Sequence, residues 1–143
     1  MFAPSQEQVR RFFCEAWAKS LAGQPLTPLE AQACDWITQH SEYHDDLADV
    51  DAAIVRQYTV EEGRTNPFLH LSMHLSITEQ VSIDQPRGVK QAVALLARRL
   101  NSLHEAHHVA MEALGEMVWD AQRSGKPFDG EAYIDRLQMR ATR

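Results

Sequence analysis

The chain has little of what marks several large classes of protein. Among its 143 residues it has two cysteines, Cys14 and Cys34, too few for a disulfide framework. Its 14 basic side chains are outnumbered by 20 acidic ones, giving a formal charge of -6. Nucleic acids and anionic membranes both bind to basic faces, so we expect neither as a partner. No apolar run approaches the roughly 20 residues that a membrane span requires.

Sequence motifs of common chemistries are missing as well. The chain shows no glycine-rich phosphate loop, no Cys-x-x-Cys motif and no nucleophile elbow. Its first residues, MFAPSQEQVRRFF, do not have the basic-then-apolar pattern of a signal peptide. The default expectation is therefore a cytoplasmic protein with reduced thiols. Cys14 lies beside an apolar stripe, so we expect a buried, inert thiol.

What the sequence does contain is a series of helix signals, which predict an all-α fold. We expect a single domain over residues 1–143, built as a bundle of four to six helices. Ser5 and Thr27 are the predicted N-caps of the first two helices, the second within a capping box closed by Glu30. The apolar stripe of the second helix continues through His40 and His44, with a break allowed near Ser41.

The second half of the chain is expected to contain one long helix. It begins at Asp84 and Pro86 and runs to about Ser124, with a break allowed at 101–102. Asp129 is the predicted cap of a last helix with a basic end. A short helix over 52–58 and a solvated loop over 61–65 are expected between the second helix and Asn66.

Residues 69–78 give conflicting signals. The text LHLSMHLSIT alternates apolar and polar residues, which is a strand pattern. Asn66 and Pro67, however, form a cap-plus-proline start, and no second strand-like run exists to pair with a lone strand. We therefore predict a helix here.

The most unusual feature is the number and spacing of the seven histidines. Six of them form i,i+4 pairs: His40/His44, His70/His74 and His104/His108. Chance predicts about a third of one such pair, and residues four apart lie one above the other on a helix. Two imidazoles so placed can converge on one metal ion, and imidazole is the commonest ligand of transition metals.

The apolar stripe of the long helix places His107 at the centre of the buried face, with His104 and His108 towards one side. Glu112 falls at the edge of that face, one turn after His108. We predict a transition-metal site formed by His70, His74, His104 and His108. Glu112 and the His40/His44 pair are candidates for a fifth ligand, a second site or supporting side chains. His107 is expected to be structural.

Two other metal chemistries fit less well. His104-Glu105-Ala106-His107-His108 contains the short zinc-peptidase string H-E-x-x-H, but few residues remain for a substrate cleft. Glu105 and His108 also match half of a di-iron carboxylate motif, whose second Glu-x-x-His copy does not occur here. A different alternative is that the histidines are simply hydrogen-bonded to carbonyls and carboxylates.

Two segments carry a resemblance to a known family. NPFLHLSMHLSITEQVSIDQPRGV (66–89) and HEAHHVAMEALGEMVWDAQRSG (104–125) resemble the small proteobacterial family called domain of unknown function 1841. QPLTPLE and the H-x-E-Y-H over 40–44 fit it too. The resemblance implies an all-helical fold and nominates the six paired histidines, but supplies no reaction. At 41 the family usually has proline, which favours a break there, and at 107 it has glutamate, so His107 departs from it.

These observations lead to two functional hypotheses. In the first, zinc or iron, with nickel or copper as further options, is bound by the histidines. An open coordination position would then make the protein a metal-dependent hydrolase or transferase of unknown small-molecule substrate. In the second, the protein is a non-catalytic helical interaction module whose histidines are structural. Under either hypothesis, aromatic and methionine side chains on a long helix favour a homodimer.

Overall fold

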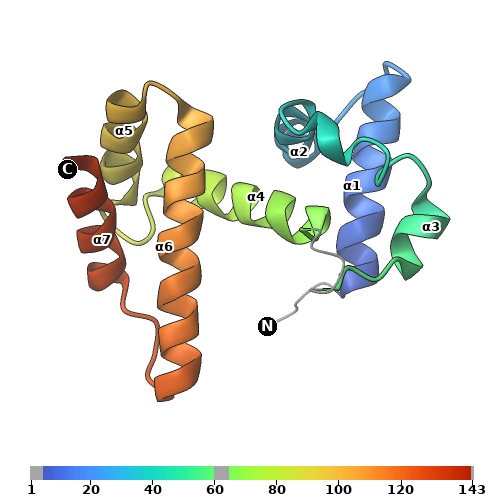
Figure 1. Ribbon diagram of the computed structural model, residues 1–143. Helices are drawn as coiled ribbons and strands as arrows, with labels where there is room; N and C mark the ends of the chain where they lie inside the picture. Colours follow the sequence, from blue (N-terminus) through green and yellow to red (C-terminus); the bar gives the residue numbers. More distant parts are fainter. Residues whose placement is uncertain (1–4, 60–64, 143) are drawn as a thin grey trace. The chain divides into compact units, whose positions relative to one another are not determined.

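The computed structural model describes residues 5–59 and 65–142, and every regular element in them is a helix. Figure 1 shows the elements in chain order. They are α1 (Gln6–Leu21), α2 (Pro28–Thr38), the 3-10 turn η1 (Ser41–Tyr43), α3 (Val50–Val55), α4 (Pro67–Ile83), α5 (Val89–Leu100), α6 (Leu103–Ser124) and α7 (Gly130–Thr142). The all-α prediction is confirmed, with seven α-helices in the described residues where four to six were expected. Among the same residues, no helix is both long and apolar enough to cross a membrane.

Contacts within the chain divide it into two compact units, residues 1–75 and 76–143. The division falls within α4, so that helix contributes residues to both units. The expectation of one domain over 1–143 remains a prediction.

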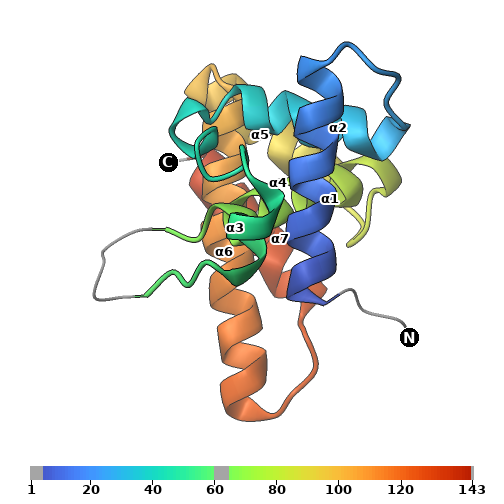
Figure 2. The same cartoon turned by 90° about the vertical axis from the view of Figure 1, so that its right-hand side faces the viewer.

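In the first unit, α1 packs against α2 and α3. Figure 2 shows α3 beside α1. Phe13 and Cys14 of α1 meet Ala33, Trp36 and Ile37 of α2 in a core completed by Leu47, Ala53, Phe68 and Leu71. Cys14 is 3% exposed and burial raises the pKa of its thiol to about 11, so the expectation of a buried thiol is confirmed, and its inertness remains a prediction.

The predicted helix starts of this unit are confirmed because they rest on local hydrogen bonds. The Ser5 side chain accepts a hydrogen bond from the Gln8 amide, and that of Thr27 accepts one from the Glu30 amide. In both cases the third residue returns a bond to the cap, which completes a capping box. The Asn66 side chain caps α4 by accepting from the Phe68 amide, which settles 69–78 as helix.

In the second unit, α5, α6 and α7 pack against one another (Figure 1). The predicted long helix is divided at Asn101, whose left-handed backbone ends α5, and Ser102 caps α6 through the Glu105 amide. The predicted start at Asp84 and Pro86 is wrong, because α5 begins at Val89. Asp84 instead accepts hydrogen bonds from the amides of Gly88 and Lys90. The Asp129 cap of α7 is confirmed by its bond from the Ala132 amide.

Other predicted segments have mixed outcomes. The short helix expected over 52–58 is present as α3, which begins two residues earlier and ends at Val55. The loop expected over 61–65 lies, except for its last residue, outside the described residues. Gly125, with φ +73°, ends α6 in the left-handed conformation that glycine adopts without strain.

A buried arginine joins α1 to the end of α3. Arg10 is 7% exposed, and its Nη1 donates to the main-chain oxygens of Ala53, at 2.8 Å, and of Arg56. Its guanidinium lies over the rings of Tyr58 and Phe68, at 5.6 and 5.3 Å from their centroids. The carbonyls at the end of a helix have no amide donor within that helix, and Arg10 supplies hydrogen-bond donors at the end of α3.

We expect Arg10→Met to lower the free energy of unfolding by about 2–3 kcal/mol, because it leaves buried carbonyl oxygens without a donor. Urea denaturation measures the effect. The matched control is Arg11→Met, which removes an exposed pair with Glu7 at 3.6 Å and should cost less than about 0.5 kcal/mol. Equal losses in the two variants would contradict the role assigned to Arg10.

Candidate functional site

The seven histidines lie on three parts of the fold. His70 and His74 are on α4, and His104, His107 and His108 are on α6. The helical spacing expected for His40 and His44 is wrong, because α2 ends at Thr38 and these two residues flank the 3-10 turn. Helical geometry therefore explains two of the three pairs.

Three histidine rings of the first unit pack against one another. The ring centroid of His40 lies 4.9 Å from that of His70 and 4.8 Å from that of His74, and His70 and His74 are 4.8 Å apart. His74 is 0% and His40 4% exposed, whereas His70 is half-buried. The structure thus brings the predicted ligands His70 and His74 together with His40. We call these three residues the histidine triad.

Two aromatic side chains enclose the triad. Trp36 stacks on His74 with centroids 4.2 Å apart and an angle of 20° between the rings. Tyr43 lies nearly parallel to His40 at 5.3 Å. Neither role was predicted from the sequence. A signal was present for Trp36, which lies four residues before His40, and for Tyr43, which lies between two histidines.

The carbonyls at the end of α2 orient two of the imidazoles. Nδ1 of His40 is 2.6 Å from the Trp36 oxygen, and Nε2 of His44 is 2.9 Å from the Ile37 oxygen. A carbonyl can only accept, so each of these nitrogens carries the proton. Nε2 is then the nitrogen that His40 offers to a metal. His44 is turned towards α2 and packs on Trp17 at 4.7 Å, which suits a supporting side chain.

The separation of the α4 histidines fits a shared metal ion. Their Nε2 atoms are 3.2 Å apart. Two nitrogens bound to one tetrahedral zinc, each at about 2.0–2.1 Å, are separated by about 3.3 Å. The same distance fits a direct N–H···N hydrogen bond between neutral rings. The geometry therefore suits both hypotheses drawn from the sequence.

Two pairs of histidines could also each contribute ligands to a metal ion. The ligand nitrogens of His40 and His74 lie within 4.8 Å of each other, and so do those of His104 and His108. Each pair could therefore give two ligands to an ion. The rings of His104 and His108 are 4.4 Å apart, and both residues are half-buried. Glu105 approaches Nδ1 of His108 at 3.8 Å and is exposed.

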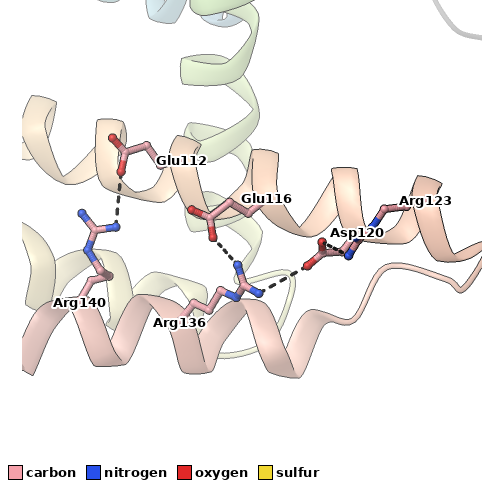
Figure 3. Close-up of polar contacts among 6 residues, drawn as sticks. All are labelled: Glu112, Glu116, Asp120, Arg123, Arg136 and Arg140. Atoms are coloured by element: carbon pink, nitrogen blue, oxygen red, sulfur yellow. Dashed lines mark hydrogen bonds and ion pairs between the residues drawn. The ribbon is translucent and has the colours of Figure 1, made fainter.

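Glu112, a candidate fifth ligand, lies elsewhere on α6. Its carboxylate is exposed and pairs with Arg140 of α7 at 3.4 Å. Figure 3 shows it as the first member of an ion-pair ladder in which Arg136 also contacts Glu116 and Asp120. In the structure its partner is thus an arginine.

His107 occupies the core of the second unit, as predicted. It is 3% exposed, and its pKa is lowered from 6.5 to about 4, first by burial and then by repulsion from His104 and His108. The ring therefore stays neutral at physiological pH. Its place is that of a structural residue.

Comparison with known proteins identifies one match. A family model described as domain of unknown function (DUF1841) matches residues 5–139. No curated protein and no solved structure matches the chain. The family description names no reaction, so the functional argument rests on the geometry of the histidines.

We expect the stability of metal-free protein to fall as pH falls from 6.5 towards 4, by up to about 3 kcal/mol from His107 alone. In this window the unfolded chain takes up a proton on His107 that the folded protein does not. Urea denaturation of chelator-treated protein at both ends of the window measures the loss. His107→Leu should remove this part of the pH dependence, and an unchanged dependence in that variant would contradict the assignment.

Proposed function

The chain belongs to the DUF1841 family, and from that premise we propose that it binds a transition-metal ion through its histidines. One observation carries the proposal. In the histidine triad, two Nε2 atoms lie 3.2 Å apart and a third imidazole packs against both rings. Burying two imidazoles beside a half-buried third is costly, and a shared cation would offset that cost by accepting nitrogen lone pairs.

The donor set restricts the metal. Imidazole nitrogen suits zinc, iron, nickel and copper, whereas calcium and magnesium require oxygen ligands. We propose zinc or iron. The hydrogen bond from His40 to the Trp36 oxygen supports this role, because ligating histidines almost always donate their other N–H to a carbonyl or carboxylate.

His104 and His108 of α6 form a further candidate pair of ligands, within the second unit. Their i,i+4 spacing on a helix and the 4.4 Å between their rings suit two ligands of one ion. His44 has a supporting role, since its Nε2 is bonded to the end of α2. We assign Glu112 no ligand role, because it is exposed and paired with Arg140.

The chemistry of such a site depends on whether a coordination position stays open. A metal with an open position lowers the pKa of bound water and polarises carbonyl or phosphoryl groups, which would make the protein a hydrolase or transferase. Around the triad, Trp36 and Tyr43 would fix the imidazoles and limit the access of water. With every position filled, the ion would stabilise the fold alone.

We expect untagged protein to contain about one equivalent of zinc or iron by elemental analysis, and chelator to lower its melting temperature. His70→Ala and His74→Ala should each remove most of the metal. The matched control, His44→Ala, deletes a half-buried imidazole whose Nε2 is bonded to a carbonyl, and should retain it. Less than roughly 0.2 equivalents in the wild type, with a melting temperature unchanged by chelator, would overturn the proposal.

The second candidate function is a non-catalytic interaction module that forms a homodimer. Exposed apolar side chains on α6 favour it, since Trp119 is 63% and Val118 41% exposed. Exposed tryptophans are enriched at protein interfaces, where they give large buried areas at a small cost in entropy.

Sedimentation equilibrium tests this second function. We expect Trp119→Ser to weaken self-association at least tenfold, because it removes the largest exposed apolar side chain on α6. Leu21→Ser, at a position that is 71% exposed on α1, is the control and should leave association unchanged. A monomeric wild type at high protein concentration would exclude the homodimer.

A further inference from the structure

Arg10 carries a buried positive charge that no carboxylate among the described residues neutralises. The residue is 7% exposed, and the polar partners of its guanidinium are the main-chain oxygens of Ala53, Ile54 and Arg56. Charged side chains are almost never this buried unless they are paired, because removing a charge from water is costly. The carbonyls and the two aromatic rings offset part of that cost, and an anion would offset more.

The Arg10 guanidinium also has N–H groups that make no hydrogen bond within the described part of the chain. All of its hydrogen bonds within the described part of the chain come from Nη1. Arginine has five N–H groups in a planar fork, of which Nη1 supplies two. Nε and Nη2 together offer the parallel pair of N–H groups that bind a carboxylate at two points.

These donors belong to a residue that lines a small cleft. The cleft, of about 250 Å³, is bordered by Arg10, by the polar side chains of Gln6 and Asn66, and by the apolar side chains of Val9, Phe68 and Leu69. Arg10, Gln6 and Asn66 also line a second cleft on the side of residues 54–59. The first cleft combines one cation, two amides and an apolar wall, a typical lining for a small-molecule site.

We propose that this cleft binds a small monocarboxylate, with its carboxylate on Arg10 and a short apolar body against Val9, Phe68 and Leu69. The volume lies below the usual range of ligand pockets, which limits the ligand to a few heavy atoms beyond the carboxylate. A single cation in a chain of net charge -6 suits one negative charge better than the two of a phosphate monoester. The site is separate from the histidines and does not depend on the proposed function.

Benzoate is the probe, and its neutral analogue benzamide is the matched control. The protein is treated with chelator so that carboxylate binding to a metal does not contribute, and NMR follows the Arg10 side-chain Nε–H and the Asn66 amide. We expect benzoate to shift both signals with a dissociation constant of about 1 mM or tighter. Benzamide and inorganic phosphate should bind at least tenfold more weakly.

Two variants separate the site from the structural role of Arg10. Gln6→Glu places a carboxylate four residues before Arg10 on α1, where it can occupy the guanidinium, so benzoate should bind at least tenfold more weakly while the melting temperature rises. Gln6→Ala removes the same amide without adding a charge, so it should weaken benzoate binding only by the loss of one amide contact, and less than Gln6→Glu does. Equal binding of benzoate and benzamide, tighter binding of phosphate, or unchanged benzoate affinity in Gln6→Glu would each overturn the proposal.

Discussion

The structure depends on how it satisfies imidazoles that are kept away from water. A neutral imidazole has one donor and one acceptor, and each costs free energy if it is buried without a partner. His40, His74 and His107 are all more than nine-tenths buried. In the first unit, the Trp36 carbonyl accepts from the ring of His40, and Trp36 and Tyr43 stack on the rings of His74 and His40. In the second unit, the low pKa of His107 shows the cost that burial imposes on its charged form.

The end of α2 therefore also positions two histidine side chains. The Trp36 and Ile37 oxygens of its last turn accept from the amides of Gln39 and His40, and each also bonds to an imidazole. This arrangement requires the chain to leave the α-helix at Thr38 and to return His40 and His44 through a 3-10 turn. A continuous helix would carry both rings past these oxygens.

Features set by neighbouring residues could be predicted from the sequence. Ser5, Thr27 and Asp129 cap their helices through bonds that span three residues. A similar local cap at Asn66 starts α4, although the sequence of that helix alternates apolar and polar residues. The predictions failed where distant contacts decide. Arg10 bonds to carbonyls more than 40 residues away, and nothing near it in the sequence marks it as buried. The i,i+4 rule indicated which histidines matter, but it could not show that His40 joins the α4 pair while His44 turns away.

The ion-pair ladder between α6 and α7 bears on the register in which these two antiparallel helices pair. Its acidic members, Glu112, Glu116 and Asp120, are spaced by one helical turn, and so are Arg136 and Arg140. If α7 slid by one turn, about 5.4 Å, towards Asp120, each arginine would still meet a carboxylate. The ladder therefore favours antiparallel pairing of α6 and α7 but is compatible with more than one register. The register is set by contacts that a one-turn slip would break. These are the packing of the fully buried Tyr133 and the hydrogen bond from its hydroxyl to Gln80.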